Sequence, residues 1–358
     1  MANRKEEIIR LQNQIIRQMT DANLRSIGED LWGRSPLDTP SGEEATPPPG
    51  YPEVPDVFGT AHKDAQKPAG TAEAAAQEPE DIEKLKEELH AYIGLTVVKA
   101  EVESLINLVK VNKLRQEHDL PTEDLSLHMV FSGNPGTGKT MIARLMSRIY
   151  HSLGILSKGH LIEVDRGGLV AGYVGQTAIK TGEVIQKALG GVLFIDEAYA
   201  LTTRGPQDYG QEAVETLLKA MEDHRDDLVV IVAGYVDLMK DFVQSNPGLE
   251  SRFNRFLYFP DYSVDEMLAI FDMRCKNAGY VLDAAARDQL RLILAEESQD
   301  NIGFGNARGV RNLFEQALSR QANRLAHQDT LTRDELMLLK KEDLLPADDP
   351  DEGENAAQ

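Results

Sequence analysis

Hydrophobic positions between residues 81 and 344 follow two spacings that alternate along the chain. Five short, mainly apolar stretches are predicted to be strands: 127–132, 160–165, 192–196, 228–233 and 255–259. Stretches with helical spacing separate them, and two more helices, 81–90 and 95–118, precede the first strand. Because the strand candidates do not alternate between apolar and polar residues, they predict a parallel sheet with helices on both faces, which is the α/β class.

Beyond residue 263 only the helical spacing continues, in the segments 264–277, 284–297, 307–327 and 333–339. We therefore expect two domains, an α/β domain over residues 81–262 and a small all-α lid domain over residues 263–344. Acidic residues dominate the last segment, 345–358, and we expect it to be disordered.

The segment before residue 81 has two parts with different composition. Residues 1–32 predict an amphipathic helix whose apolar stripe consists of Ile8, Leu11, Ile15, Ile16, Met19 and Leu24. That stripe could pack on the chain's own globular body, self-associate or dock on another protein. Residues 33–80 are rich in Pro, Ala, Glu, Gly and Thr and have few large apolar residues, so they are expected to form a disordered tether.

Composition excludes some classes of function. The net charge of −21 disfavours general binding to nucleic acid, although a local basic pore remains compatible with it. The single cysteine, Cys275, cannot form an intrachain disulfide and suits a reducing cytoplasm. No apolar run approaches 18 residues, so we expect neither a signal peptide nor a transmembrane helix.

The strongest chemical signal directly follows the first predicted strand. The residues Gly133, Asn134, Pro135, Gly136, Thr137, Gly138, Lys139 and Thr140 form the pattern of a phosphate-binding P-loop between a strand and a helix. Its glycines let backbone N–H groups face phosphate oxygens, Lys139 can reach the β- and γ-phosphates, and the Thr140 hydroxyl can bind Mg²⁺. The alternative is a glycine-rich turn that binds no ligand. The order of strand, loop and helix, which phosphate binding requires, disfavours it.

An acidic pair supplies the expected second half of a nucleotide site. Asp196 and Glu197 follow four apolar residues at the end of the third predicted strand. We expect Asp196 to hold Mg²⁺ and Glu197 to polarise the water that attacks the γ-phosphate of ATP. The alternative is a helix-capping Asp196 beside a solvated Glu197.

These motifs together resemble the AAA+ ATPases, with Gly234-Tyr235, Ser251-Arg252-Phe253 and Gly305-Asn306-Ala307-Arg308 as further matches. More narrowly, the segments 127–140, 208–213 and 259–262 resemble the CbbX/CfxQ and stage V sporulation protein K group. The resemblance covers about residues 81–327. It implies ATP and Mg²⁺ as cofactors, hydrolysis of ATP to ADP and phosphate, and a homo-oligomeric ring, expected to be a hexamer.

The resemblance also assigns roles to basic residues. Arg252 stands where the family has an arginine finger, which stabilises transition-state charge in the neighbouring subunit's site, and Arg255 is the alternative. Arg308 resembles the sensor-2 arginine that contacts the phosphates, with Arg311 as the less favoured candidate. Tyr235 stands at the sensor-1 position, where many family members have Asn or Thr, so the polar contact to the attacking water is in doubt.

Tyr173 lies between glycines in the segment 169–177 and resembles a substrate-gripping pore loop. An aromatic ring on a glycine-flanked loop can press against an extended peptide of any sequence. Lys180 could add contacts there. The alternative is that the Tyr173 ring packs beneath the loop as part of the core.

The sequence therefore predicts a cytoplasmic ATP-driven motor that remodels a partner protein by gripping it in a central pore. A red-type Rubisco is one specific client that the resemblance suggests. Two other classes remain: an ATP-dependent switch or assembly adaptor that threads nothing, and a nucleic-acid ATPase resembling a clamp loader, which the acidic balance opposes. The client and the partner of the first helix cannot be identified from the sequence.

Overall fold

The computed structural model describes residues 79–345, except 123–124, 174, 204–207, 327 and 329. The predicted N-terminal helix, the tether up to residue 78 and the tail beyond residue 345 lie outside the described residues. None of the helices within the described range is long and apolar enough to cross a membrane.

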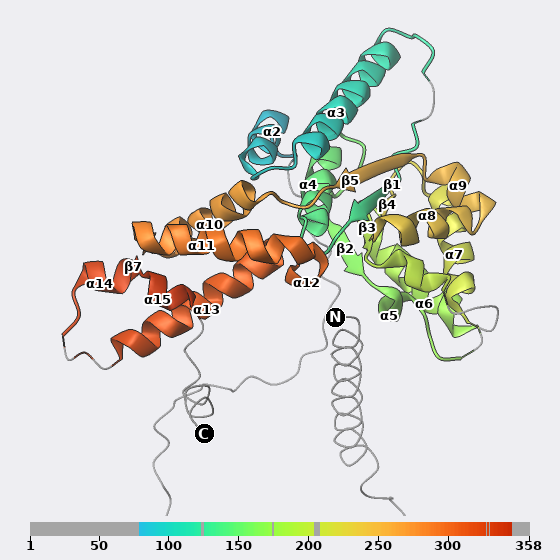
Figure 1. Cartoon of the computed structure of the whole chain (residues 1–358). Coiled ribbons are helices and arrows are strands. Elements are labelled where there is room, and N and C mark those ends of the chain that lie inside the picture. Colours follow the sequence, from blue (N-terminus) through green and yellow to red (C-terminus); the bar gives the residue numbers. More distant parts are fainter. Residues whose placement is uncertain are drawn as a thin grey trace, which may run out of the picture. The chain divides into compact units, whose positions relative to one another are not determined.

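A five-stranded parallel sheet forms the centre of the α/β part (Figure 1). Its strands are β1 (Met129–Gly133), β2 (Leu161–Val164), β3 (Val192–Ile195), β4 (Val229–Gly234) and β5 (Arg255–Phe259). Their spatial order is β2-β3-β4-β1-β5, and every neighbouring pair is parallel. The predicted parallel α/β sheet is thereby confirmed.

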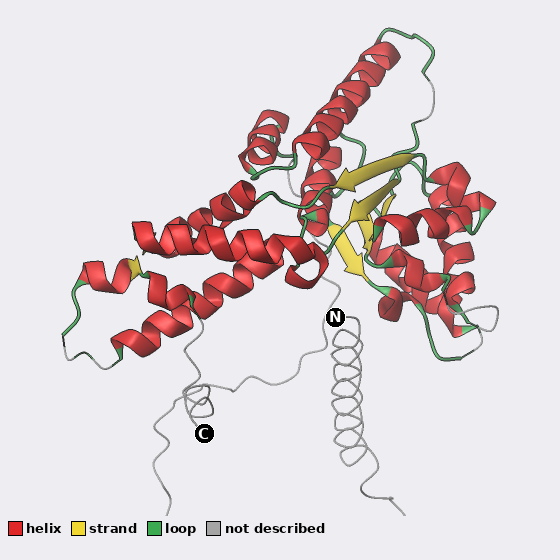
Figure 2. Cartoon of the chain, in the orientation of Figure 1, coloured by secondary structure: helices red, strands yellow, loops and turns green. Residues whose placement is uncertain are grey.

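Helices cover both faces of this sheet, as Figure 2 shows. One layer contains α2 (Ile82–Ala91), α3 (Thr96–Glu117) and α4 (Lys139–Ser152); the other contains α5 (Arg166–Leu169), α6 (Gln176–Ala188), the 3₁₀ helix η1 (Ala198–Leu201), α7 (Gly210–Asp223), α8 (Val236–Gln244) and α9 (Pro247–Arg252). Successive strand residues point to opposite faces, so Phe131 and Phe194 join one core while Val130 and Leu193 join the other. Both cores require apolar residues, which explains the apolar runs of β1, β3 and β4, the strands that are buried throughout.

The first strand begins two residues later than the hydrophobic pattern predicts. The ring Nδ1 of His128 accepts a hydrogen bond of 3.0 Å from the backbone N–H of Val230 on β4. This side-chain bond satisfies a backbone donor just before the regular pairing of β1 and β4 begins at Met129 and Ile231.

Helices dominate the lid, as expected. They are α10 (Val264–Ala278), α11 (Ala284–Glu297), η2 (Ser298–Asp300), α12 (Asn301–Phe304), α13 (Ala307–Leu325), α14 (Arg333–Met337) and α15 (Lys341–Leu344). Helix α10 starts with a capping box between Ser263 and Glu266 and ends at Gly279, whose φ of 75° suits glycine. Phe271 and Phe314 pack edge to face with ring centroids 5.4 Å apart, joining α10 to α13.

One expectation for the lid is corrected. Helix α14 does not continue to Leu339, because Leu338 and Leu339 form strand β7 (Leu338–Leu339). This strand pairs in parallel with β6 (Val281–Leu282), which the sequence analysis did not predict. Two-residue strands are too short to show a periodic pattern, and their pairing joins segments distant in the sequence.

Candidate nucleotide site

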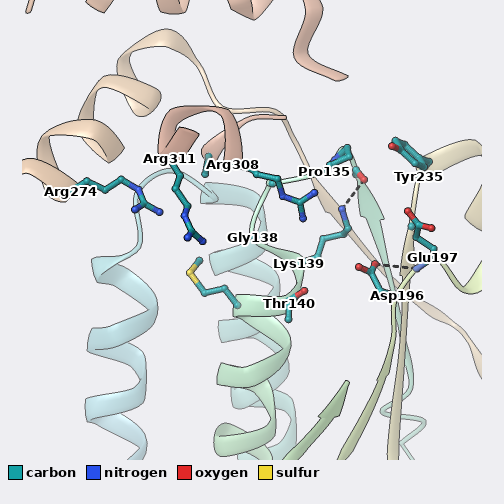
Figure 3. Close-up of a pocket in the computed structure, with 15 residues that line it drawn as sticks. Pro135, Gly138, Lys139, Thr140, Asp196, Glu197, Tyr235, Arg274, Arg308 and Arg311 are labelled. Atoms are coloured by element: carbon teal, nitrogen blue, oxygen red, sulfur yellow. Dashed lines mark hydrogen bonds between the residues drawn. The ribbon is translucent and has the colours of Figure 1, made fainter. Parts of the chain in front are cut away.

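The P-loop connects β1 to α4 in the predicted order (Figure 3). Gly136 and Gly138 have φ values of 74° and 97°, in the left-handed region that glycine adopts without strain. The loop therefore curls at the N-terminus of α4, where free backbone N–H groups and the helix dipole favour an anion.

A cavity of about 460 Å³ opens above this loop, between the sheet and the lid. Its lining residues come from the P-loop, the ends of β3 and β4, and the lid: Gly133, Pro135, Gly136, Gly138, Lys139, Thr140, Met141, Asp196, Glu197, Gly234, Tyr235, Arg274, Ala307, Arg308 and Arg311. The two predicted halves of the nucleotide site thus meet in one cavity.

Lys139 lies across the P-loop. Its Nζ donates to the carbonyl oxygens of Gly133 and Asn134, at 2.9 and 2.8 Å. Burial lowers the pKa of Lys139, and the charge of Arg308 acts in the same direction, while Asp196 is the foremost charge that opposes the shift. An anion between Lys139 and Arg308 would relieve this repulsion, so the pair is suited to bind phosphate.

Two predicted P-loop residues turn their side chains toward the protein. The Thr137 hydroxyl donates to the Asn134 carbonyl at 2.8 Å and is fully buried. The Asn134 amide donates to both carboxylate oxygens of Asp261, at 3.0 and 2.9 Å. These side chains stabilise the loop, and only the backbone of these residues remains to contact a phosphate.

The acidic pair stands where β3 ends. Asp196 still belongs to the strand's ladder, since its N–H donates to the Val164 carbonyl at 2.8 Å. Glu197 has left-handed backbone angles, φ 48° and ψ 41°, which cost a non-glycine residue roughly 1 kcal/mol or more. Figure 3 shows the Asp196 carboxylate directed toward Lys139 and Thr140 of the P-loop, and Glu197 beside Tyr235 in the same cavity.

Three arginines of the lid line the cavity. Arg308 points toward Lys139, whereas Arg311 lies farther along the cavity and pairs with Glu315 at 2.7 Å. The third, Arg274 of α10, was not predicted, and its buried Nε has no hydrogen-bond partner within the described residues. An arginine on an amphipathic helix is an ordinary surface residue by its sequence alone, so no signal pointed to it.

A second unpredicted feature joins the lid to the P-loop. Asn306 is fully buried; its amide donates to Asp261 at 2.8 Å and to the Pro135 carbonyl at 3.3 Å, and its oxygen accepts from the Tyr262 N–H at 2.9 Å. Asn306 and Asp261 both belong to the segments that carry the family resemblance, which was the available signal. Their hydrogen bonds hold the start of α13 beside the P-loop.

Neither arginine-finger candidate lines the cavity of its own chain. Arg252 ends α9 and donates to Glu222 of α7 at 2.9 Å. The Nε of Arg255 donates to the Ser126 carbonyl at 3.0 Å. Both guanidinium groups are therefore engaged by groups outside the nucleotide site of their own chain.

Tyr173 is 73% exposed, so the alternative in which its ring packs beneath the loop is wrong. Lys180 does not extend beside it, because its Nζ donates to the carbonyls of Gly167 and Val170, at 2.6 and 3.1 Å. The base of the loop is thus fixed and its aromatic side chain faces solvent.

Tyr235 directly follows β4 and lines the cavity beside Glu197 (Figure 3). Its ring lies 6.2 Å from that of Tyr199, whose pKa is raised to about 12, by burial first and by Glu197 second. Tyr235 is therefore placed beside Glu197, and its sensor-1 role remains a prediction.

The chain matches two family models, "ATPase family associated with various cellular activities (AAA)" over residues 129–261 and the AAA lid domain over residues 263–354. It is 41% identical to stage V sporulation protein K of Bacillus subtilis over 265 residues, covering 74% of this chain and 82% of that protein. It is 47% identical to CbbX of Cereibacter sphaeroides, covering 69% and 79%. It is 44% identical to the chloroplastic ribulose bisphosphate carboxylase/oxygenase activase of Cyanidioschyzon merolae, covering 71% and 87%.

The fold, the cavity with its P-loop and acidic pair, and these similarities agree with one another. The chain belongs to the AAA+ ATPases, within the group of CbbX/CfxQ proteins and stage V sporulation protein K, and it hydrolyses ATP.

Proposed function

We propose that this ATPase is a cytoplasmic motor that remodels a partner protein by gripping it with Tyr173 in the central pore of a ring. The observation that carries the proposal is the exposed Tyr173 ring on a loop whose base is held by hydrogen bonds. A flat ring in solvent can contact an extended peptide without reading its sequence, which a motor for unfolded segments requires.

Lys139 and Arg308 are proposed to hold the phosphates of ATP, and Glu197 to orient and polarise the attacking water. Arg274 lies along the same wall and could add a further positive charge. Thr140 and Asp196 both line the cavity and offer hard oxygen donors, which fit Mg²⁺. When bound, the metal ion would neutralise charge that develops on the phosphates.

We propose a homo-hexameric ring in which Arg252 completes the neighbouring subunit's site. This role is supported by the Arg252 side chain, which pairs with Glu222 and does not line the cavity of its own chain. A head-to-tail interface that repeats by rotation closes into such a ring. Arg255 remains the alternative finger.

The client is proposed from the relatives alone. One relative is named an activase of ribulose bisphosphate carboxylase/oxygenase, so a red-type Rubisco is the specific candidate. The relative from Bacillus subtilis carries a sporulation name, so a different client is equally compatible with membership of the group.

A substrate trap tests this function. The variant Glu197→Gln should bind ATP, hydrolyse it roughly 100-fold more slowly or worse, and retain a client on the ring. When Tyr173→Ala is combined with Glu197→Gln, the ring should no longer retain that client. The matched control, Tyr173→Phe combined with Glu197→Gln, should still retain it.

In the background with intact Glu197, Tyr173→Ala should preserve basal ATP hydrolysis and lose stimulation by the trapped client. If Tyr173→Ala retained the client as firmly as Tyr173→Phe, gripping through the pore would be refuted. A client-independent role that survives Tyr173→Ala in cells would instead favour the switch or adaptor.

A further inference from the structure

Arg166 connects the nucleotide site to the loop that carries Tyr173. It opens α5, directly after β2, and its side chain is 17% exposed. Its Nη1 donates to the Ala200 carbonyl at 3.0 Å, and its Nη2 donates to the Asp208 carboxylate at 2.5 Å. One guanidinium thus joins α5 to η1 and to the segment that leads into α7.

The first of these contacts reaches the acidic pair. Helix η1 begins immediately after Glu197, and the Ala200 N–H donates to the Glu197 carbonyl at 2.9 Å. Any rearrangement of the Glu197 backbone therefore moves the carbonyl that Arg166 binds. Glu197 has the strained left-handed conformation described above, which is the kind of backbone that changes when a ligand arrives.

The surroundings of Arg166 leave little room for independent motion. A Cβ atom on Gly210, the first residue of α7, would lie 2.0 Å from the Leu201 carbonyl and 3.0 Å from Nη1 of Arg166. Only glycine allows this approach of α7 to η1. Tightly packed groups transmit a displacement because packed interiors deform little.

On its other side, α5 is fastened to α6 up to the edge of the loop. Thr181 donates to the Leu169 carbonyl at 3.1 Å, Lys180 holds the carbonyls of Gly167 and Val170, and the Ala171 N–H donates to Thr177 at 3.0 Å. After Ala171 the packing ends, since a Cβ atom on Gly172 would meet nothing within 4 Å. A shift of α5 would consequently carry Tyr173 with it.

We propose that Arg166 is the positioning residue that transmits the state of the nucleotide site, through η1, to the Tyr173 loop. The inference rests on the proposed motor function and adds the residue that couples hydrolysis to movement of the grip. The physical basis is a continuous series of contacts from Glu197 through Ala200 and Arg166 to α5.

The test reports loop position without a client. A cysteine introduced by Gly172→Cys has open space around it and can carry an environment-sensitive fluorophore next to Tyr173. The native Cys275 should not interfere, because it is 4% exposed and burial foremost raises the pKa of its thiol to about 12. Fluorescence is then compared with ADP and with a non-hydrolysable ATP analogue.

In the labelled parent we expect a difference in fluorescence between the two nucleotides. Arg166→Met should abolish most of that difference, while both nucleotides still bind within about twofold of the parent affinity. The control Arg144→Met removes an ion pair of 2.9 Å to Glu163 that ends on β2, and it should leave the difference unchanged.

The proposal would be overturned if Arg166→Met kept the fluorescence difference between the two nucleotides. It would also be overturned if the labelled parent showed no such difference. If Arg166→Met failed to bind nucleotide, Arg166→Gln would decide by the same criterion, since its shorter side chain keeps a polar end but has no guanidinium to bridge the Ala200 carbonyl and Asp208. Failure of the proposed motor function is seen separately, as loss of client trapping with an intact fluorescence difference.

Discussion

At the scale of single residues, a close approach between lid and P-loop depends on Gly136. A Cβ atom there would lie 2.0 Å from the Gly305 carbonyl oxygen, and the φ of 74° adds strain for any other residue. We expect Gly136→Ala to displace the lid and to weaken ATP binding by about 1–3 kcal/mol, which is roughly 5- to 150-fold. Titration with a fluorescent ATP analogue measures the change.

Gly182 in α6 provides the control for Gly136. A Cβ atom there meets nothing within 4 Å, and its position inside a helix favours alanine. Gly182→Ala should raise the free energy of unfolding by about 0.5–1 kcal/mol and leave ATP affinity unchanged. Equal ATP affinities for both alanine variants would show that the approach of Gly305 to the P-loop has no role in nucleotide binding.

At the scale of helices and strands, much of the structure could be predicted because burial on both faces forces a visible pattern. Strands β3 and β4 are completely buried, and their apolar runs give their positions within a residue or two. Strands β6 and β7 carry no such pattern, because two residues cannot show a period. Their pairing arises from the tertiary arrangement of the lid.

The residues of the nucleotide site could likewise be predicted only in part. The P-loop and the acidic pair could be predicted because phosphate chemistry fixes their residue types and spacing. Arg274 and Asn306 could not be given roles, because they reach the cavity or the P-loop only through the placement of the lid. Sequence spacing contains no information about that placement.

His128, at the start of β1, makes the stability of the sheet depend on pH. Its pKa is lowered from 6.5 to about 4, by burial foremost and also by the charge of Arg252, against an opposing hydrogen bond to the Met221 backbone. Between about pH 6.5 and pH 4, His128 is protonated in the unfolded chain but neutral in the folded chain. The free energy of unfolding therefore decreases as the pH falls through this range. The loss from this residue should be about 3 kcal/mol.

Urea unfolding between pH 7 and pH 4.5 measures this contribution. In His128→Asn the side-chain oxygen can still accept from the Val230 N–H, but nothing titrates at that position. The variant should be less stable than the parent at pH 7, and the gap should narrow as the pH falls. A gap that stays constant would assign the acid sensitivity to other groups.

At the scale of the whole molecule, Asn306 ties the lid to the nucleotide-binding part. Asn306→Ala removes bonds to Asp261, Pro135 and the Tyr262 N–H, and it leaves that buried donor without an acceptor, at a cost of about 1–3 kcal/mol. We expect faster hydrogen exchange at Tyr262 and in the P-loop, together with weaker ATP binding.

Gln321→Ala is the matched control for Asn306→Ala. Gln321, like Asn306, has a buried side-chain amide, but it lies within α13 and its Nε2 donates to the Leu336 and Leu338 carbonyls, which remain inside the lid. This variant should destabilise the lid without changing ATP affinity. If both variants weakened ATP binding equally, general loosening of the lid would explain the effect, and the Asn306 network would have no specific role.

The proposed ring predicts that two inactive variants restore ATP hydrolysis when they assemble into mixed rings. If Arg252 acts in the neighbouring subunit, Arg252→Ala subunits retain a competent Glu197, while Glu197→Gln subunits retain a competent finger. Each variant alone should be nearly inactive. In an equal random mixture, about a quarter of the interfaces pair a competent site with a competent finger, so about a quarter of the parent ATPase rate should return.

ATP turnover measured across mixing ratios should therefore peak near equal proportions. Arg255→Ala replaces Arg252→Ala in the control mixture and distinguishes the two candidate fingers. If Arg255 only holds the Ser126 carbonyl, Arg255→Ala alone should keep substantial activity, and mixing it with Glu197→Gln should only dilute that activity. A mixture of Arg252→Ala and Glu197→Gln that stays inactive, although mass spectrometry detects mixed rings, would exclude Arg252 as a finger acting between subunits. Recovery with Arg255→Ala in its place would transfer the role to Arg255.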